Sequence, residues 1–348
     1  CIFIYRGGIM TSTYFLGANS AQGFYSLYGG FPPRSGFLHI IKGGPGTGKS
    51  GFMRAIGSEA ERRGMDVEYV LCSGDPDSLD GVYIPALNEA WVDGTAPHAL
   101  DPTIFGVTGD YVNLGRFCRT PFSSENQVAI RRITPAYKAL YAEGYEHIAA
   151  AGKCEVRGGF DLAPLEKRLD MILRRCPADS APYERRVFLR AISCRGLISL
   201  ADTLAGYGET YEFTSSHGGG APALELVRRE AERRGLCRVL SMSPLHPERI
   251  DAVLLPAAGI AFFDGSYGTG SARHIRLDSM LTGSPRSGHA AEARAVASLR
   301  GKLLDLAVEK LSRAKALHDE LELQYRPYMD FPALTDYTNA EISRIFGN

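Results

Sequence analysis

The stretch "KGGPGTGKSG", residues 42–51, indicates how the rest of the chain is organised. From Gly43 to Ser50 it satisfies the pattern G-x-x-x-x-G-K-[S/T]. The run "FLHII", residues 37–41, precedes it and is typical of a buried parallel strand. "SGFMRAIGSEAERRG", residues 50–64, follows with apolar residues at helical spacing and a final glycine where a helix can end. The order of strand, glycine loop and helix is the one that this pattern requires.

The residue types in this loop suit a nucleoside triphosphate with Mg²⁺. Its glycines let the backbone curl so that N–H groups converge on phosphate oxygens, and the following helix points its positive end at the same anion. We expect Lys49 to contact the β- and γ-phosphates as a catalytic group, and the Ser50 hydroxyl to complete the Mg²⁺ shell. The predicted ATP site comprises Gly43, Gly44, Pro45, Gly46, Thr47, Gly48, Lys49, Ser50 and Gly51. The chain has no N/T-K-x-D motif for guanine, which leaves ATP as the expected nucleotide.

Asp93 is the predicted acidic partner of this loop. It ends the apolar segment "EAWVD", the position of a carboxylate that holds Mg²⁺ through water, so we predict it as a catalytic residue and, with Ser50, as a metal ligand. Asp264 ends "GIAFFD" in the same way, which keeps open a structural role such as capping the next turn. Gly94 follows Asp93 where many ATPases keep a glutamate base, which favours slow hydrolysis or phosphoryl transfer.

Two other polar residues are candidates for positioning a water or a substrate hydroxyl. Asp75 is replaced by His246 in the second half, and His98 has no clear counterpart there, so both polar groups are specific to the first copy. A solvated loop residue is the alternative for both. Asp80 recurs as Asp251 and is as ambiguous as Asp93.

The chain contains an internal duplication. "EAERRG" occurs at 59–64 and again at 230–235, and the same displacement matches 14 of 36 positions from 59 to 94. With a slightly larger displacement, residues 14–28 match residues 187–201 at 7 of 15 positions. The sequence therefore predicts two copies of one α/β unit.

The glycine loop of the second copy lacks the lysine and the serine of the first. "SSHGGGAP", residues 215–222, places Gly220 or Ala221 where Lys49 stands, and Ala221 or Pro222 where Ser50 stands. Neither the phosphate cation nor the magnesium hydroxyl remains, so we expect a structural pseudo-site and one nucleotide per chain.

The predicted fold is α/β, with two tandem P-loop NTPase-like three-layer α/β/α units, parallel sheets and helical arms. Domain boundaries are expected at 10–180 for the intact unit and 181–348 for the degenerate one, with the Pro- and charge-rich segment 174–186 between them. In each copy a strand near 13–17 or 187–191 should lead into a helix. Strands at 67–72 and 89–93, or 237–242 and 260–264, should follow the P-loop helix, with a loop between them.

Residues 289–325 predict a long helical arm in the second copy. An apolar stripe at helical spacing is expected to pack, and it consists of Leu299, Leu303, Leu311, Ala314, Leu317 and Leu321. Such arms are also the surface through which a protein partner could bind.

Composition limits the other classes of function. Lys plus Arg and Asp plus Glu both number 39 in 348 residues, so no net charge draws the protein to nucleic acid or an anionic membrane. The seven cysteines form no C-x-x-C pair, which argues against a zinc site or disulfide framework and fits the cytoplasm. No apolar run has the length of a membrane span. The chain begins with Cys1, and we expect translation to start at Met10.

Several segments resemble an uncharacterised bacterial family of tandem P-loop ATPase-like proteins. They are "GFYSLY" (23–28), "IIKGGPGTGKS" (40–50), "CSGDPDSLDGVYIPAL" (72–87), "VDGTAPH" (92–98), "ALHDELE" (316–322) and "MDF" (329–331). The resemblance covers nearly the whole chain from about Met10, and it implies an α/β NTPase fold with nucleotide bound at Gly43 to Ser50. Both halves can keep a P-loop in that family, and this sequence departs from it in its second half.

The leading hypothesis is a slow Mg²⁺-dependent ATPase whose nucleotide state alters the arrangement of its halves. One alternative is a P-loop kinase for an unknown small molecule, with lid arginines drawn from Arg116, Arg119, Arg131 and Arg132. The other is a non-catalytic, nucleotide-regulated interaction module. An AAA+ ring ATPase fits less well, because no arginine-finger segment is evident.

Overall fold

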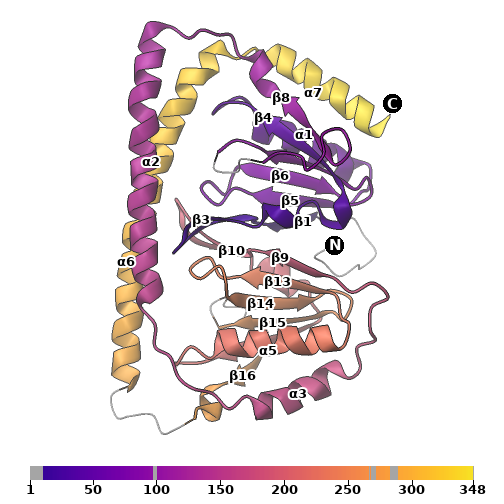
Figure 1. Ribbon diagram of the computed structural model, residues 1–348, viewed down its shortest axis with the longest axis vertical. Coiled ribbons are helices and arrows are strands. Elements are labelled where there is room, and N and C mark those ends of the chain that lie inside the picture. The colour runs from indigo at the N-terminus through magenta and orange to yellow at the C-terminus, as the bar shows by residue number, and fades with distance from the viewer. Residues whose placement is uncertain (1–10, 97–99, 266, 268–271, 283–288, 348) are drawn as a thin grey trace.

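The computed structural model describes residues 11–96, 100–265, 267, 272–282 and 289–347. Two six-stranded sheets lie one above the other in Figure 1, and a pair of long helices runs along one side of both. Each sheet belongs to one half of the sequence, so the chain is an α/β protein built from two similar units.

The first sheet has the strand order β1-β5-β6-β7-β4-β8. Its strands are β1 (Thr11–Tyr14), β4 (Phe37–Lys42), β5 (Val67–Leu71), β6 (Leu79–Ile84), β7 (Glu89–Asp93) and β8 (Gly109–Asn113). β4 is parallel to both β7 and β8, whereas β6 is antiparallel to both of its neighbours. The sheet is therefore mixed.

The second sheet repeats this topology in the order β9-β13-β14-β15-β12-β16. Its strands are β9 (Glu184–Val187), β12 (Glu209–Thr214), β13 (Arg238–Met242), β14 (Ile250–Leu255), β15 (Ile260–Asp264) and β16 (Arg273–Arg276). β14 is the antiparallel strand here. The matching order of six strands supports the duplication that the sequence predicts. The expectation of purely parallel sheets is wrong, because β6 and β14 lie in segments that were expected to be loops.

A β-hairpin follows the first strand of each unit, where a helix was expected. β2 (Gly17–Ser20) pairs with β3 (Gly23–Ser26), and β10 (Arg190–Ser193) pairs with β11 (Gly196–Ser199). The turns need the left-handed conformation, and a glycine supplies it at φ +86° in one hairpin and +103° in the other. The helix prediction fails because these turn glycines end the periodic pattern.

One helix covers one face of each sheet. α1 (Lys49–Arg62) packs on β5, β6 and β7, and α5 (Gly220–Arg233) packs on β13, β14 and β15. On the opposite faces, side chains of both sheets join a single buried cluster that includes Ile40 and Val92 from the first and Leu254 and Phe263 from the second. The three-layer α/β/α expectation is therefore corrected: the second face of each sheet contributes to a core that the two units share.

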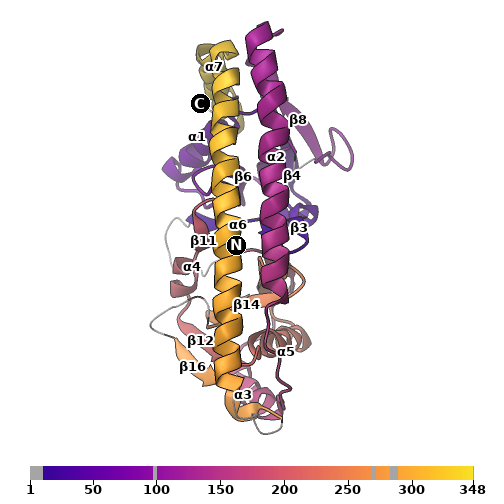
Figure 2. The same cartoon turned by 90° about the vertical axis from the view of Figure 1, so that its left-hand side faces the viewer.

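The remaining long helices connect the units. α2 (Ser124–Lys153) and α6 (His289–Tyr325) pack side by side over most of their lengths (Figure 2). α3 (Ala163–Leu173) packs on α5 of the second unit, and α7 (Phe331–Phe346) packs on α1 of the first, while α4 (Asp202–Ala205) is a single short turn. The end of the chain thus returns to the first unit.

The helical arm forms where its apolar pattern predicts it, with one difference in the stripe. Leu311, Ala314 and Leu321 are buried, and Ala307 joins them, but Leu299 is 52% exposed. α2 ends at Lys153, and Arg300 of α6 donates a hydrogen bond to the carbonyl oxygen of Cys154, so the first turns of α6 extend beyond the end of α2. No helix among the described ranges is long and apolar enough to cross a membrane.

Candidate phosphate-binding site

The glycine loop between β4 and α1 has a fixed backbone conformation. Gly46 and Gly48 have φ values of +67° and +86°, which residues with a side chain adopt only with strain. The Thr47 hydroxyl is buried and donates a 2.8 Å hydrogen bond to the carbonyl oxygen of Gly44. Within the described part of the chain, the N–H groups of Gly46 and Gly48 donate to no protein acceptor. The loop is therefore ordered and keeps backbone donors available for an anion.

Lys49, the first residue of α1, lies at the centre of the site. Its Nζ donates to the carbonyl oxygens of Gly43 (3.1 Å) and Gly44 (2.9 Å) and lies 3.6 Å from Oδ2 of Asp93. The two side chains are 11% and 15% exposed. The structure thus brings together the two residues predicted as catalytic.

Strand pairing explains the position of Asp93. β7 lies parallel to β4, and Asp93 is the partner of Ile41 in the register. Parallel neighbours end at the same edge of a sheet, so the last residue of β7 meets the loop that follows β4. Oδ1 of Asp93 also accepts hydrogen bonds from the N–H (2.8 Å) and hydroxyl (2.6 Å) of Thr95. The turn-capping role that the sequence left open is therefore present alongside the ion pair.

Ser50 occupies the second position of α1, and its Oγ accepts a 2.9 Å hydrogen bond from the N–H of Leu79 at the start of β6. Its hydroxyl and the Asp93 carboxylate are oxygen ligands of the kind that Mg²⁺ prefers, since this ion takes few protein ligands beside phosphate and water. The described residues hold no cluster of three His, Cys, Asp or Glu side chains that could bind a metal. The residues present fit a Mg²⁺ that arrives with a triphosphate.

Residues far along the chain form the outer wall of the site. A methyl group added to Gly44 would lie 2.7 Å from the Tyr325 ring, and one added to Gly46 would lie 3.2 Å from Cβ of Glu322. At Gly48 it would meet Leu334 of α7 at 2.8 Å. The end of α6 and the start of α7 therefore pack directly on the loop. The family-like segments 316–322 and 329–331 lie in this region, but nothing in the sequence indicates that they contact the loop.

The segment after β5 links this site to its surroundings. Asp75 accepts a 3.1 Å hydrogen bond from Ser78 and forms a 3.3 Å ion pair with Lys315 of α6. Asp77 pairs with Arg195 in the hairpin turn of the second unit. Asp75 therefore has a structural partner, which argues against the water-positioning role considered from the sequence. The other candidate for that role, His98, lies outside the described residues.

Most of the arginines considered for a kinase lid hold the C-terminal helices in place. Arg116 stacks on the Tyr337 ring of α7 at 4.2 Å, Arg119 donates to the carbonyl oxygen of Pro327, and Arg132 pairs with Glu320 at 2.7 Å. These contacts favour a structural role for them.

The second glycine loop is filled by protein groups. Three of its N–H groups are used internally: that of Ser216 donates to Asp278, and those of His217 and Gly219 donate to Oγ of Ser215. A methyl group at Gly219 would lie 2.8 Å from the Phe160 ring, which covers the loop. α5 begins at Gly220, 171 residues after Lys49, so glycine occupies the helical position of the lysine.

In the second unit, whose glycine loop has no lysine, the cation near the strand-end aspartate is Arg190. It lies 3.8 Å from Asp264, the counterpart of Asp93, and binds the buried Asp251 at 2.6 Å. Arg190 comes from β10, whereas β2 of the first unit begins with Gly17 at the related position. The acidic residues of the second unit are thus neutralised from within the protein.

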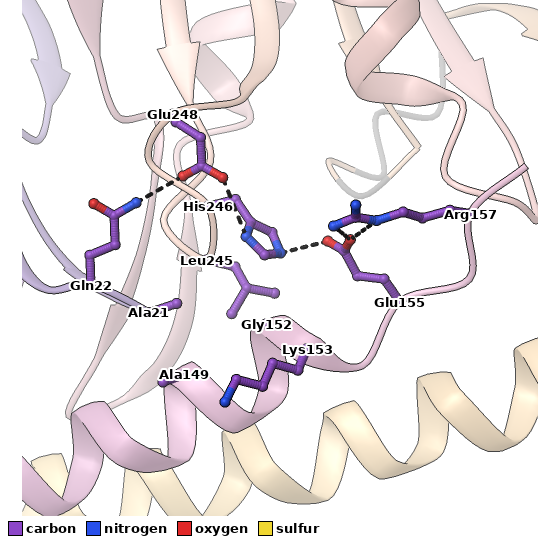
Figure 3. A pocket seen from close by; sticks show the side chains of 10 residues that line it. All are labelled: Ala21, Gln22, Ala149, Gly152, Lys153, Glu155, Arg157, Leu245, His246 and Glu248. Atoms are coloured by element: carbon purple, nitrogen blue, oxygen red, sulfur yellow. Dashed lines mark hydrogen bonds and ion pairs between the residues drawn. The ribbon is translucent and has the colours of Figure 1, made fainter. Parts of the chain in front are cut away.

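A separate cavity of about 400 Å³ lies at the junction of the two units (Figure 3). His246 stands between Glu155 and Glu248, and Arg157 binds Glu155, while Gln22 reaches Glu248 from the first unit. Burial and the nearby Arg249 lower the pKa of His246. The contact of Gln22 with Glu248 joins the two units across this cavity, and no residue of the glycine loop is among those that line it.

Comparison of the chain with protein-family models, curated proteins and solved structures finds no match. The resemblance to tandem P-loop proteins therefore rests on the motifs alone and stays a prediction. What can be said of function comes from the geometry of the loop, Lys49 and Asp93.

Proposed function

We propose that this protein binds Mg·ATP at the loop from Gly43 to Gly51 and hydrolyses it slowly, with one site per chain. The observation that carries the proposal is the position of Lys49, which lies beneath the glycine loop and 3.6 Å from the strand-end carboxylate of Asp93. Lys49 thus supplies a cation and Asp93 a carboxylate at the edge of the sheet where β4 and β7 both end. This combination suits a phosphate chain that carries a divalent cation.

Each group has a role that follows from its chemistry. Among the described residues, the ammonium of Lys49 contacts two neutral carbonyl oxygens and, at longer range, one carboxylate, and phosphate oxygens would bind it more strongly. The N–H groups of Gly46 and Gly48 and the start of α1 add donors and a favourable dipole for the same anion. Ser50 and Asp93 would hold the Mg²⁺, which supplies positive charge where negative charge develops on the transferred phosphoryl group.

We expect hydrolysis to be slow. Gly94 follows Asp93 at the position where many ATPases have a glutamate base, so the end of β7 supplies no base. A methyl group at Gly94 would lie 2.2 Å from the Ile40 side chain, so packing in the shared core excludes a larger residue there. Any base must come from another part of the chain. Three of the arginines considered for a kinase lid instead contact the C-terminal part of the chain, which weakens the kinase alternative.

The proposal is tested by ATP turnover with purified protein and Mg²⁺, comparing the wild type with Lys49→Ala. We expect slow release of phosphate from the wild type and a decrease of at least about 100-fold in the variant, because loss of the cation removes stabilisation from the developing charge. Circular dichroism checks that the variant is folded. Transfer of phosphate to a metabolite instead of water, or tight binding without turnover, would contradict hydrolysis and favour a kinase or a regulated interaction module.

A further inference from the structure

Helix α6 turns one polar face toward the glycine loop. Lys315, His318, Glu322 and Tyr325 are spaced by three or four residues, which places them on the same side of a helix. Tyr325 and Glu322 contact Gly44 and Gly46 as described above, and Lys315 pairs with Asp75. Both ends of this face are thus anchored at the candidate site, and His318 lies between them.

His318 and Glu322 form a pair next to the glycine loop. Nδ1 of His318 lies 3.7 Å from Oε1 of Glu322, so the carboxylate turns back along the helix toward the imidazole. The other side of the imidazole packs edge-on against Tyr137 of α2, with ring centroids 5.7 Å apart. Neither side chain is sealed from solvent, since His318 is 36% and Glu322 is 39% exposed. A water molecule can therefore reach the pair.

The charges around His318 favour its neutral form. Burial is the main cause that lowers its pKa, and the positive charges of Lys315 and Lys49 act in the same direction, while Glu322 and Asp319 oppose them. Burial and these positive charges therefore favour an uncharged imidazole beside the Glu322 side chain.

We propose that Glu322 is the base that accepts a proton from the attacking water, and that His318 positions its carboxylate. This inference rests on the proposed ATPase function and supplies the base that β7 lacks. A helix from the far end of the chain thus completes the site of the first unit.

The step that this assigns is simple hydrolysis. The water oxygen forms a bond to the γ-phosphorus, and the bond from that phosphorus to the β,γ-bridging oxygen breaks with its electron pair going to ADP. One water proton goes to the Glu322 carboxylate and then to solvent. The products are ADP and inorganic phosphate.

The test compares Glu322→Gln and His318→Asn with Glu309→Gln and His147→Asn, which make the same changes at α6 and α2 positions away from the loop. Binding of a non-hydrolysable ATP analogue is measured by calorimetry, and turnover is measured from pH 5 to 8. Glu322→Gln keeps the Cβ and backbone atoms that contact Gly46, so the loop contact is preserved.

We expect Glu322→Gln to lower kcat at least about 100-fold while Kd changes less than about 3-fold. The wild type should lose turnover at acid pH as His318 gains a proton and draws Glu322 into an ion pair, and this acid limb should move to lower pH in His318→Asn. The two controls should match the wild type.

Turnover by Glu322→Gln within about twofold of wild type, or an acid limb unchanged in His318→Asn, would overturn the assignment. If Lys49→Ala abolishes binding and turnover while Glu322→Gln is fully active, the ATPase proposal stands and this inference alone is wrong. If the wild type neither binds nor hydrolyses ATP, both are wrong.

Discussion

The carboxylates that end β7 and β15, Asp93 and Asp264, have different cationic partners in the two units. Asp93 faces Lys49 from the glycine loop, at 3.6 Å, whereas Asp264 faces Arg190 from a hairpin strand, at 3.8 Å. Among the described residues, the one anionic partner of Lys49 lies at this longer range, which supports the proposal that Lys49 binds phosphate. Arg190 is committed to the buried carboxylate of Asp251 by hydrogen bonds of 2.6 Å and 3.0 Å. The proposed anion site and the structural ion pair therefore differ in where their cation comes from and in what else that cation binds.

Arg190→Met is expected to destabilise the protein by about 3–5 kcal/mol at pH 7.5, because it leaves the charge of Asp251 buried without a cation. Urea unfolding measures this. The matched control is Arg195→Met, whose pair with Asp77 is exposed and should cost less than about 1 kcal/mol. Equal losses in the two variants would contradict the role assigned to Arg190.

The same variant should be less impaired at acid pH. Burial raises the pKa of Asp251 from 3.8 to about 6, against the opposing charge of Arg190. A carboxyl whose folded-state pKa lies above its unfolded value stabilises the fold when protonated, so this contribution is lost as pH rises through about 6. Removing Arg190 raises the pKa further, and the destabilisation should therefore be smaller at pH 5 than at pH 7.5.

At the level of elements, the sequence predicts those parts whose pattern is local. The helix at 289–325 and the strands at 37–41 and 89–93 follow from periodicity, and they are found within a residue or two of the expected ends. β6 was missed because "LDGVYI" contains an aspartate and a glycine that are typical of turns. All six of its residues are buried, and Gly81 fits between Val70 and Val92, so tertiary packing overrides the local preference.

The residues of the candidate site also fall into those that a local sequence pattern predicts and those that it does not. Lys49, Ser50 and Asp93 lie in a motif and at a strand end, and the structure places Lys49 and Asp93 together. Glu322, Tyr325 and Leu334 follow the loop by more than 270 residues, and although Glu322 ends the family-like segment 316–322, nothing in the sequence indicates that these residues contact the loop. Their positions depend on how α6 packs on α2 and on the return of the chain to the first unit, which no local signal encodes.

Helix α7 should contribute measurably to the stability of the first unit. Leu334 is 7% exposed and packs in the same cluster as Phe52 and Met53 of α1, beside Gly48. Leu334→Ala is expected to cost about 2–3 kcal/mol through the lost contacts and the cavity left behind. The control is Leu323→Ala, which removes the same group from a side chain that is 58% exposed. If the control costs as much, the packing assigned to α7 is wrong.

At the level of the whole molecule, the two units share a hydrophobic cluster and are joined by backbone and ionic contacts. Phe15 and Phe188 exchange backbone hydrogen bonds of 2.9 Å in each direction, which joins the first strands of the two sheets. Beside this bridge, Arg185 of the second unit binds the buried Glu68 of the first at 2.8 Å. Together with the shared hydrophobic cluster, these contacts make independent folding of either unit unfavourable, since separation would expose apolar faces and an unpaired charge.

Cooperativity can be measured with the single tryptophan of the chain, Trp91, which lies on β7 of the first unit. Phe263→Ala removes a fully buried ring from the second unit and should cost about 3–5 kcal/mol. Its effect should appear equally in Trp91 fluorescence and in far-UV circular dichroism, with coincident midpoints. Leu197→Ala, at a half-exposed position, is the control. A Trp91 transition that does not shift in Phe263→Ala would show that the units unfold separately.

The measurement that tests the central claim most directly is calorimetric titration of the protein with a non-hydrolysable ATP analogue and Mg²⁺. The first loop offers free backbone donors and Lys49, whereas the donors of the second loop bind Asp278 and Ser215 and its surface is covered by Phe160. We predict saturation at one nucleotide per chain and complete loss of binding heat in Lys49→Ala. A second equivalent that survives in Lys49→Ala, or unchanged binding by that variant, would contradict the account.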